Sequence, residues 1–421
     1  MDPCYLNKLA PKTRRGLLLN HPGFCLDPPH LISKSSQEAY YHDMRTDFLP
    51  KLAFAFAVAS AAANPAWAAE HTKTPPKATP AKSKAPTQHV YPKFGKVERL
   101  DPKFDELIPA TSELEKLAEG FVWSEGPVWV PGGNYLLFSD VPRNVVFKWK
   151  EGQGTTEYLF PSGYTGSKQR GGEPGSNGLT LDDTGRLVLC QHGDRSVARL
   201  ESNRKFTTLA QFHKGRRFNS PNDLVFAANG DLYFTDPPYG LEGNNADPKK
   251  ELLYNGVYKL TKAGTLTLLT DKISFPNGIA LSPDDKTLYV AVSDSAKPVI
   301  MSYSIKKDGQ LGDEKVFFNA AGLMEGRKGV PDGLKVDRQG NLFATGPGGV
   351  LVISPEGKHL GTINTGEPTA NCAWGDDGST LYITANHTLC RIKTSTKGKG
   401  FAPPVLTQLP GTPAPKPAHK K

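Results

Sequence analysis

Five oxygen-bearing side chains stand at the same position of a repeated sequence unit, and together they could bind a hard cation. Each opens a short apolar segment and precedes a Gly or Asp turn position by eight residues. The five residues are Glu125, Asn177, Asn222, Asn277 and Asp332, and the turn positions are Gly133, Gly185, Gly230, Asp285 and Gly340. Equivalent positions in a closed repeat protein converge on one axis. The sequence therefore predicts two carboxylates and three amide oxygens around one ion, a set that suits Ca²⁺ or Mg²⁺.

Short strands are the elements that would position these side chains. A strand signal follows every turn, for example Leu232-Tyr233-Phe234 and Leu342-Phe343-Ala344, and a sixth unit has Ala370 at the first position. Each unit reads as four strands joined by turns. Six such units predict an all-β fold, a six-bladed β-propeller with four-stranded antiparallel blades. The last unit lacks an outer strand, and we expect residues 114–121 to supply it, so that the N-terminal strand closes the ring by joining the last blade.

A second set of polar residues should surround the same opening. Antiparallel order places the starts of first strands and the ends of second strands at one mouth of the ring. The ends of the second strands carry Asp140, His192 with Asp194, Asp236, Asp294 and His387. Asp and Asn are common at turns, so a single residue of this kind could be structural. Five oxygen residues at a constant offset favour a ligand site.

The motifs around these positions resemble the gluconolactonase family. They are Ser124-Glu125-Gly126-Pro127-Val128-Trp129, Ser220-Pro221-Asn222-Asp223, Phe234-Thr235-Asp236-Pro237-Pro238-Tyr239-Gly240, Pro276-Asn277-Gly278-Ile279-Ala280-Leu281-Ser282-Pro283-Asp284 and Pro331-Asp332-Gly333-Leu334. The resemblance covers roughly residues 108–395. It implies a six-bladed propeller that binds one divalent metal ion, usually calcium, in its central channel and hydrolyses a lactone.

The resemblance also implies roles for single residues. Glu125, Asn277 and Asp332 match the metal ligands of the family, and Asn222 matches an asparagine that contacts metal, substrate or a metal-bound water. These four are the predicted metal ligands. Asp332 matches the general acid/base as well, so it is the predicted catalytic residue.

Substrate binding is predicted for Asn222, Asn177, His192 and Asp236. Asn177 is not among the metal ligands that the family shares. We therefore expect it to contact the substrate or to support the metal ligands from outside the coordination sphere. One position departs from the pattern. Some members carry an arginine two residues before the asparagine of the third blade, whereas this chain has Ser220.

The expected function is an exported, metal-dependent lactone hydrolase. The cofactor would be one divalent ion, with Ca²⁺ expected and Mg²⁺ or Zn²⁺ as alternatives, because all-oxygen ligation favours hard cations. Asp223, Asp236 or His192 could orient the water instead of Asp332. Two other functions stay open: a phosphotriesterase-like hydrolase on the same scaffold, and a propeller with a structural metal whose mouth binds a partner or a sugar without turnover.

Residues 44–68 have the parts of a secretory signal peptide. Positive residues precede the apolar run Leu52–Ala63, and Ala66-Trp67-Ala68 follows as a cleavage site. The run is shorter than the ~20 residues of a membrane-spanning helix. We expect a periplasmic or secreted protein whose translation begins at Met44. Residues 1–43 would then be a leader wrongly included in the gene model, and a disordered extension is the alternative.

The rest of the chain divides into a linker over residues 69–103, a propeller domain over 104–400 and a tail over 401–421. Both flanks are basic and rich in Pro. Residues 70–103 contain eight Lys or Arg and three Asp or Glu, while residues 393–421 contain six Lys and no acid, so the flanks carry more positive charge than the +9 of the whole chain. The charge lies outside the repeats, which argues against a nucleic-acid partner.

Three cysteines lie in the repeats, namely Cys190, Cys372 and Cys390. Cys372 and Cys390 fall on the first and third strands of one unit. Non-adjacent strands lie ~9–10 Å apart, beyond the ~7 Å limit for a disulfide. We expect three buried free thiols.

Overall fold

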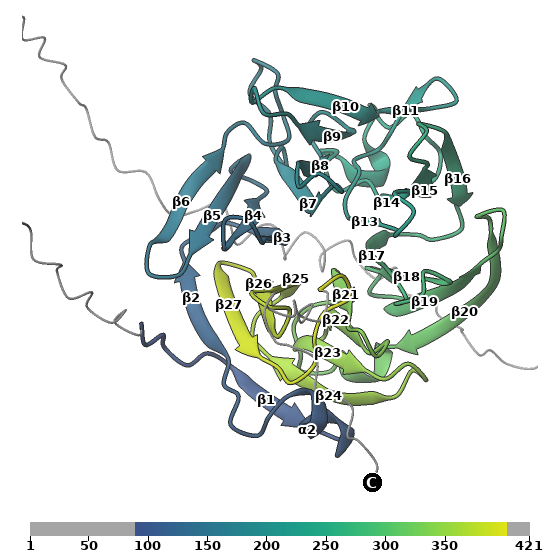
Figure 1. Cartoon of the computed structure of the whole chain (residues 1–421). Coiled ribbons are helices and arrows are strands. Elements are labelled where there is room, and N and C mark those ends of the chain that lie inside the picture. Colours follow the sequence, from purple (N-terminus) through teal and green to yellow (C-terminus); the bar gives the residue numbers. More distant parts are fainter. Residues whose placement is uncertain (1–88, 402–421) are drawn as a thin grey trace, which may run out of the picture. The chain divides into compact units, whose positions relative to one another are not determined.

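The computed structural model describes residues 89–401, which form six antiparallel sheets arranged in a ring (Figure 1). This confirms the predicted six-bladed β-propeller. The predicted signal peptide, the leader before it and nearly all of the basic tail lie outside the described residues. Within residues 89–401, no helix has both the length and the apolar character needed to cross a membrane.

Every blade is built from strands in simple antiparallel order, numbered from the central channel outward. Blades 1 to 3 are β3 (Ser124–Val130), β4 (Tyr135–Asp140), β5 (Val145–Lys150), β6 (Gly154–Leu159); β7 (Ser176–Leu181), β8 (Leu187–Gln191), β9 (Ser196–Leu200), β10 (Phe206–Ala210); β13 (Leu224–Phe226), β14 (Leu232–Asp236), β15 (Gly256–Leu260), β16 (Leu266–Thr270). Blades 4 to 6 are β17 (Pro276–Leu281), β18 (Thr287–Val292), β19 (Val299–Ile305), β20 (Leu311–Asn319); β21 (Leu334–Val336), β22 (Leu342–Gly346), β23 (Gly349–Ile353), β24 (His359–Asn364); β25 (Thr369–Gly375), β26 (Thr380–Ala385), β27 (Thr388–Lys393), β2 (Glu115–Glu119).

A few short elements decorate the ring. They are the hairpin β11 (Phe212–His213) and β12 (Arg216–Arg217), the 3₁₀ turns η1 (Asn244–Ala246) and η2 (Ala321–Leu323), and the helix α2 (Lys103–Leu107). Phe104 and Leu107 of α2 are buried against the core between blades 5 and 6.

Ring closure follows the prediction. β2 pairs antiparallel with β27, with Glu115 opposite Arg391, so the last blade takes its outer strand from the N-terminal side of the propeller. Arg391 Nε also donates to the Glu115 carboxylate at 2.7 Å. The strand that precedes blade 1 and the last strand of the propeller are therefore held in one sheet.

The N-terminal boundary of the propeller differs from the predicted linker end at residue 103. β1 (Lys96–Arg99) forms a fifth strand on the outer edge of blade 5, where Lys96 pairs with Asn364. Glu98 accepts a hydrogen bond from the Asn364 amide and forms an ion pair with Arg327 at 2.8 Å. These partners hold the segment in place, although its charge-rich composition is typical of a linker.

Six apolar clusters account for the cohesion of the ring, one between each pair of neighbouring blades. Alternation along a strand sends successive side chains to opposite faces of the blade. In β4, Leu136 and Phe138 pack toward blade 6, while Leu137 packs toward blade 2. Cys190, Cys372 and Cys390 are buried and free, as predicted, and belong to two of these clusters.

Close contact between first strands sets the width of the channel. Gly126 has φ +51°, and a Cβ there would lie 1.9 Å from the carbonyl oxygen of Asn177 in the next blade.

Gly126→Ala should therefore destabilise the fold by about 3 kcal/mol or more, because a backbone atom must move. Gly185→Ala is the matched control, since Gly185 has φ +80° but nothing within 4 Å of the added Cβ. It should cost only the left-handed strain of about 1–2 kcal/mol. Denaturant unfolding measures both, and equal losses would contradict the tight contact.

Candidate functional site

The predicted ligand positions converge because the first strands of neighbouring blades are joined at these residues. Gly178 N donates to Asn222 O at 2.7 Å, and Gly333 N donates to Ala370 O at 2.7 Å. A Cβ on Gly278 would lie 2.1 Å from Asp332 O. In blades 1, 2, 4 and 5 the glycine after the first-position residue thus touches the backbone of the next blade, which brings the first-position residues together around the channel.

Hydroxyl groups of the second strands donate hydrogen bonds to the backbone carbonyl oxygens of first-position residues. Ser139 Oγ donates to Asn177 O at 2.9 Å, and Thr235 Oγ1 donates to Asn277 O at 2.7 Å. Thr345 Oγ1 donates to Ala370 O at 3.0 Å, which repeats the contact between blades 5 and 6. Each bond joins one blade to the first-position residue of its neighbour, so the site is part of the packing of the ring.

Two aspartates at the ends of second strands hold the loops that lead into the site. The Asp236 carboxylate accepts the N–H groups of Asn219 and Ser220 at 2.9 and 2.8 Å. In blade 1, Asp140 accepts the N–H groups of residues 122 and 123 at 3.0 and 3.3 Å. In both blades the donors stand three and two residues before the first-position residue. Both carboxylates are fully buried, and the structure gives Asp236 a loop-positioning role, while its substrate role stays a prediction.

Three oxygen atoms of the predicted set lack a hydrogen-bond partner although they are buried. They are Oδ1 of Asn177, Oδ1 of Asn222 and Oδ1 of Asp332. An unpaired buried acceptor normally costs about 1–3 kcal/mol, so such atoms usually have a partner. A bound cation could be the common partner of these three oxygen atoms, none of which accepts a hydrogen bond.

Electrostatics of the carboxylates point to the same partner. Burial raises the pKa of Glu125 to about 8. The N–H of Gly126 donates to this carboxylate and lowers its pKa, whereas the nearby Asp223 and Glu173 carboxylates raise it further. Burial also raises the pKa of Asp332 well above its usual range, with further increases from Glu125, Asp223 and Glu173. Like charges in a buried site favour protonation. A divalent cation would lower both pKa values and keep the carboxylates ionised.

The residues present therefore fit a hard divalent cation. Glu125 and Asp332 supply two negative charges, and Asn222 and Asn277 supply neutral amides, which is the donor set that Ca²⁺ prefers. In residues 89–401 there is no cluster of three or more His, Cys, Asp and Glu that could hold a metal, so amide oxygens are needed to complete the set.

Next to the predicted ligands lies a polar network of Asp223, Asn371 and Lys335, of which only Asp223 was predicted from the sequence. Asn371 Nδ2 lies 3.4 Å from Glu125 Oε2 and 3.5 Å from Asp223 Oδ2. Lys335 Nζ donates to Asn371 Oδ1 at 3.3 Å and lies 3.9 Å from the Asp223 carboxylate. The repeat contains the signal for this network: the position after the predicted ligand is Gly in four blades but Asp223 and Asn371 in the other two.

The mouth of the channel contains His192, Glu173 and Tyr239. His192 is fully buried, with Nε2 3.4 Å from the Asn222 amide nitrogen and Nδ1 3.2 Å from Glu173. Burial raises the pKa of Tyr239 well above its usual range, and the Asp332 carboxylate raises it further. Neither Glu173 nor Tyr239 was among the predicted site residues. Glu173 lies in a loop with no periodic pattern, and Tyr239 is marked only by its place in the Phe234–Gly240 motif.

Other residues of the second ring contact loops. Asp194 accepts the N–H and hydroxyl of Thr165 at 3.1 and 2.7 Å. Asp294 accepts the Ser274 hydroxyl at 2.7 Å, and His387 Nδ1 lies 2.8 Å from the carbonyl oxygen of residue 121. These contacts give the three residues a structural role.

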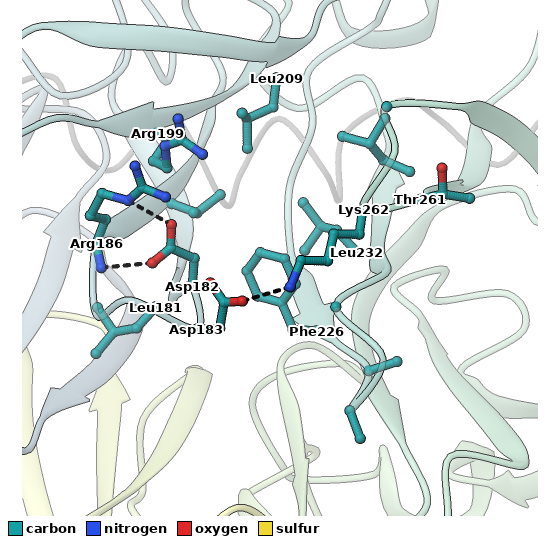
Figure 2. Close-up of a pocket in the computed structure, with 16 residues that line it drawn as sticks. Leu181, Asp182, Asp183, Arg186, Arg199, Leu209, Phe226, Leu232, Thr261 and Lys262 are labelled. Atoms are coloured by element: carbon teal, nitrogen blue, oxygen red, sulfur yellow. Dashed lines mark hydrogen bonds and ion pairs between the residues drawn. The ribbon is translucent and has the colours of Figure 1, made fainter.

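A separate cavity of about 530 Å³ lies between blades 2 and 3, at the opposite ends of the strands from the predicted ligands (Figure 2). Its apolar lining includes Leu181, Phe226 and Leu232. The charges at its rim are paired: Lys262 contacts Asp183 at 2.9 Å, Arg186 contacts Asp182 at 2.9 Å and Arg199 contacts Glu201 at 2.8 Å. The pairing leaves no unbalanced charge to attract an ionic ligand.

Comparison with known proteins agrees with this geometry. Residues 123–387 match the family described as SMP-30/Gluconolactonase/LRE-like region. A gluconolactonase of Zymomonas mobilis is 42% identical over 312 residues, covering 72% of this chain and 88% of that protein. The solved structure of XC5397, a gluconolactonase from Xanthomonas campestris, has a TM-score of 0.64 and 30% identity, covering 73% of this chain and 99% of that one. Diisopropyl-fluorophosphatase of Loligo vulgaris is 25% identical over 264 residues, covering 59% of this chain and 81% of that protein.

The chain belongs to the SMP-30/gluconolactonase/LRE-like family. The resemblance inferred from the motifs is confirmed, and with it the expectation of a gluconolactonase-like hydrolase.

Proposed function

We propose that the protein is a lactone hydrolase that depends on a divalent cation, with Ca²⁺ as the cation and a sugar-acid lactone as the substrate class. The observation that carries the proposal is the set of unpaired buried oxygen atoms on Asn177, Asn222 and Asp332, beside the carboxylate of Glu125. The relative from Zymomonas mobilis, named a gluconolactonase, supports the substrate class.

Glu125, Asn222, Asn277 and Asp332 would hold the cation. When bound, it would supply electrophilic stabilisation of the negative charge that develops on a lactone carbonyl oxygen. The packing of the first strands keeps the four side chains in place before substrate arrives. This preorganisation lowers the cost of ordering the site during the reaction.

Asp332 would also move the proton in the proposed reaction. Its Oδ1 has no hydrogen-bond partner, and the side chain is only partly exposed at the channel. As the water oxygen bonds to the lactone carbonyl carbon, the Asp332 carboxylate would take a proton from that water. The ester bond to the ring oxygen then breaks, and Asp332 returns the proton to this oxygen, which gives the open hydroxy acid.

Substrate contacts would come from the mouth. Asn177 and Tyr239 present amide and phenol groups that can bond to sugar hydroxyls, whereas both ring nitrogens of His192 face protein side chains. Ser220 offers no such contact, because its hydroxyl donates to Pro237 O at 2.6 Å and accepts Gly240 N–H at 2.9 Å. This chain would thus recognise its lactone without an arginine at position 220.

A substrate screen in a pH-stat tests the proposal. Aldonolactones, aliphatic lactones and phosphotriesters would be offered with and without added Ca²⁺, and we expect the highest kcat/KM for an aldonolactone. The similarity to diisopropyl-fluorophosphatase makes phosphotriester hydrolysis the second candidate. Hydrolysis of phosphotriesters alone would favour that candidate, and no turnover of any lactone would refute the proposed function.

We also propose that the protein works outside the cytoplasm. The support is the signal-peptide pattern of residues 44–68, which lie outside the described residues.

A further inference from the structure

The loop between blades 1 and 2 brings a carboxylate to the edge of the site. Glu173 Oε2 lies 3.2 Å from Nδ1 of His192, whose side chain is fully buried. The Glu173 side chain is itself only 13% exposed. Its charge acts on both Glu125 and Asp332. The structure thus places a charged residue of a surface loop beside the predicted ligands.

This loop is held at several points. Asn144 Oδ1 accepts the N–H groups of three consecutive residues, 162–164, at 3.1, 2.7 and 3.1 Å. Arg170 donates to the carbonyl oxygen of Gly193 at 3.1 Å and also to that of Gly240. Gly193 directly follows His192, so the loop is tied to the segment that carries the imidazole. Glu173 is therefore placed by a fixed loop.

The contacts of His192 determine where its proton lies. The Asn222 amide nitrogen, 3.4 Å from Nε2, can only donate a hydrogen bond. Nε2 is then the accepting nitrogen, and Nδ1, which lies 3.2 Å from Glu173 Oε2 but outside hydrogen-bond geometry, carries the proton. Both contacts are attractive in this one tautomer, which a carboxylate partner at Nδ1 favours.

The same contacts determine how the Asn222 amide is turned. With Nδ2 facing the imidazole, Oδ1 faces the other way, and it is buried without a hydrogen-bond partner. Blade 4 holds its amide in a similar way, because Asn277 Nδ2 donates to Ser293 Oγ at 2.9 Å. In both blades a side chain contacts the amide nitrogen, and in blade 3 the amide oxygen has no hydrogen-bond partner.

We propose that Glu173 and His192 act in series as positioning residues, which fix the Asn222 amide so that Oδ1 faces the cation site. The inference rests on the cation binding in the proposed function. Residues that orient metal ligands typically change metal affinity by ~10–100-fold when they are removed. His192 would then matter for the cation although it is not a ligand.

Calcium titration calorimetry on the full-length, chelator-stripped protein tests the inference. His192→Ala and Glu173→Leu should each weaken Ca²⁺ binding by ~10-fold or more. Glu173→Gln keeps an acceptor for the imidazole N–H and should stay within ~3-fold of wild type. Glu242→Leu is the matched control, because Glu242 contacts the same loop at Gly171 and Arg170 but does not contact His192. It should leave the affinity unchanged.

The double variant separates positioning from direct attraction between Glu173 and the cation. In series, Glu173→Leu adds nothing once His192 is Ala, because its effect passes through the imidazole. A further loss in the double variant, or equal losses for Glu173→Gln and Glu173→Leu, would show that the charge acts directly and overturn the inference. Unchanged affinity of His192→Ala would also overturn it.

If circular dichroism shows that His192→Ala is unfolded, the comparison of Glu173→Gln with Glu173→Leu decides whether the inference holds. Failure of the wild type to bind Ca²⁺ would instead remove the proposed function and this inference with it.

Discussion

Chelation of divalent cations is expected to abolish lactone hydrolysis while the propeller stays folded. Activity should fall by at least ~10²-fold, the loss typical when a group that stabilises a developing oxyanion is removed. The fold should persist because its six apolar clusters and the pairing of β2 with β27 involve none of the predicted ligands. Initial rates in a pH-stat and far-ultraviolet circular dichroism, each with and without EDTA, measure the two effects.

Restoring the metal provides the control for this experiment. Added Ca²⁺ should return the activity, and Mg²⁺ and Zn²⁺ should be tested in parallel, since an all-oxygen set discriminates against zinc. Full turnover in the presence of the chelator would contradict a catalytic metal. Loss of the dichroism signal on chelation would instead assign the metal a structural role.

The architecture of the ring was predictable because the repeat is visible in the sequence. A constant offset of eight residues between ligand position and turn marks five blades, and it places their oxygen side chains on one axis. The missing outer strand after β27 likewise predicted that residues 114–121 close the ring, as β2 does. Such periodic features follow from the geometry of blades, which every unit must obey.

Features without a period were not predictable. β1 contains a single apolar residue, Val97, between Lys96 and Glu98, and the composition of its surroundings is typical of a linker. Its pairing depends on backbone bonds to β24 and on contacts of Glu98 with distant residues. Tertiary contacts of this kind override a local sequence preference.

The site was predictable at the ligand positions and incomplete around them. Asn371 could have been found, because it occupies a repeat position that is Gly in four other blades. Glu173 could not, since it approaches His192 only through a loop anchored by Asn144 and Arg170. Asp236 shows the reverse case, in which a polar residue at the expected mouth holds a loop with both carboxylate oxygens.

Asp332→Asn should lower kcat by ~10²-fold or more at saturating Ca²⁺. Asparagine keeps an oxygen that can face the cation but cannot take the proton of the attacking water. Rates should be measured over a range of Ca²⁺ concentrations, because the loss that remains at saturation reports proton transfer and not cation affinity.

Asp294→Asn is the matched control for this substitution. Asp294 is an aspartate that follows a second strand, and its carboxylate accepts the Ser274 hydroxyl and the N–H of Ala296 in a loop. Its replacement should leave kcat within ~3-fold of wild type, since surface changes away from a site usually have small effects. A near-normal kcat for Asp332→Asn would remove Asp332 from proton transfer. Asp223 and His192 would then be the residues to test. His192 contacts the predicted ligand Asn222, and Asp223 contacts Asn371, which follows the first position of blade 6.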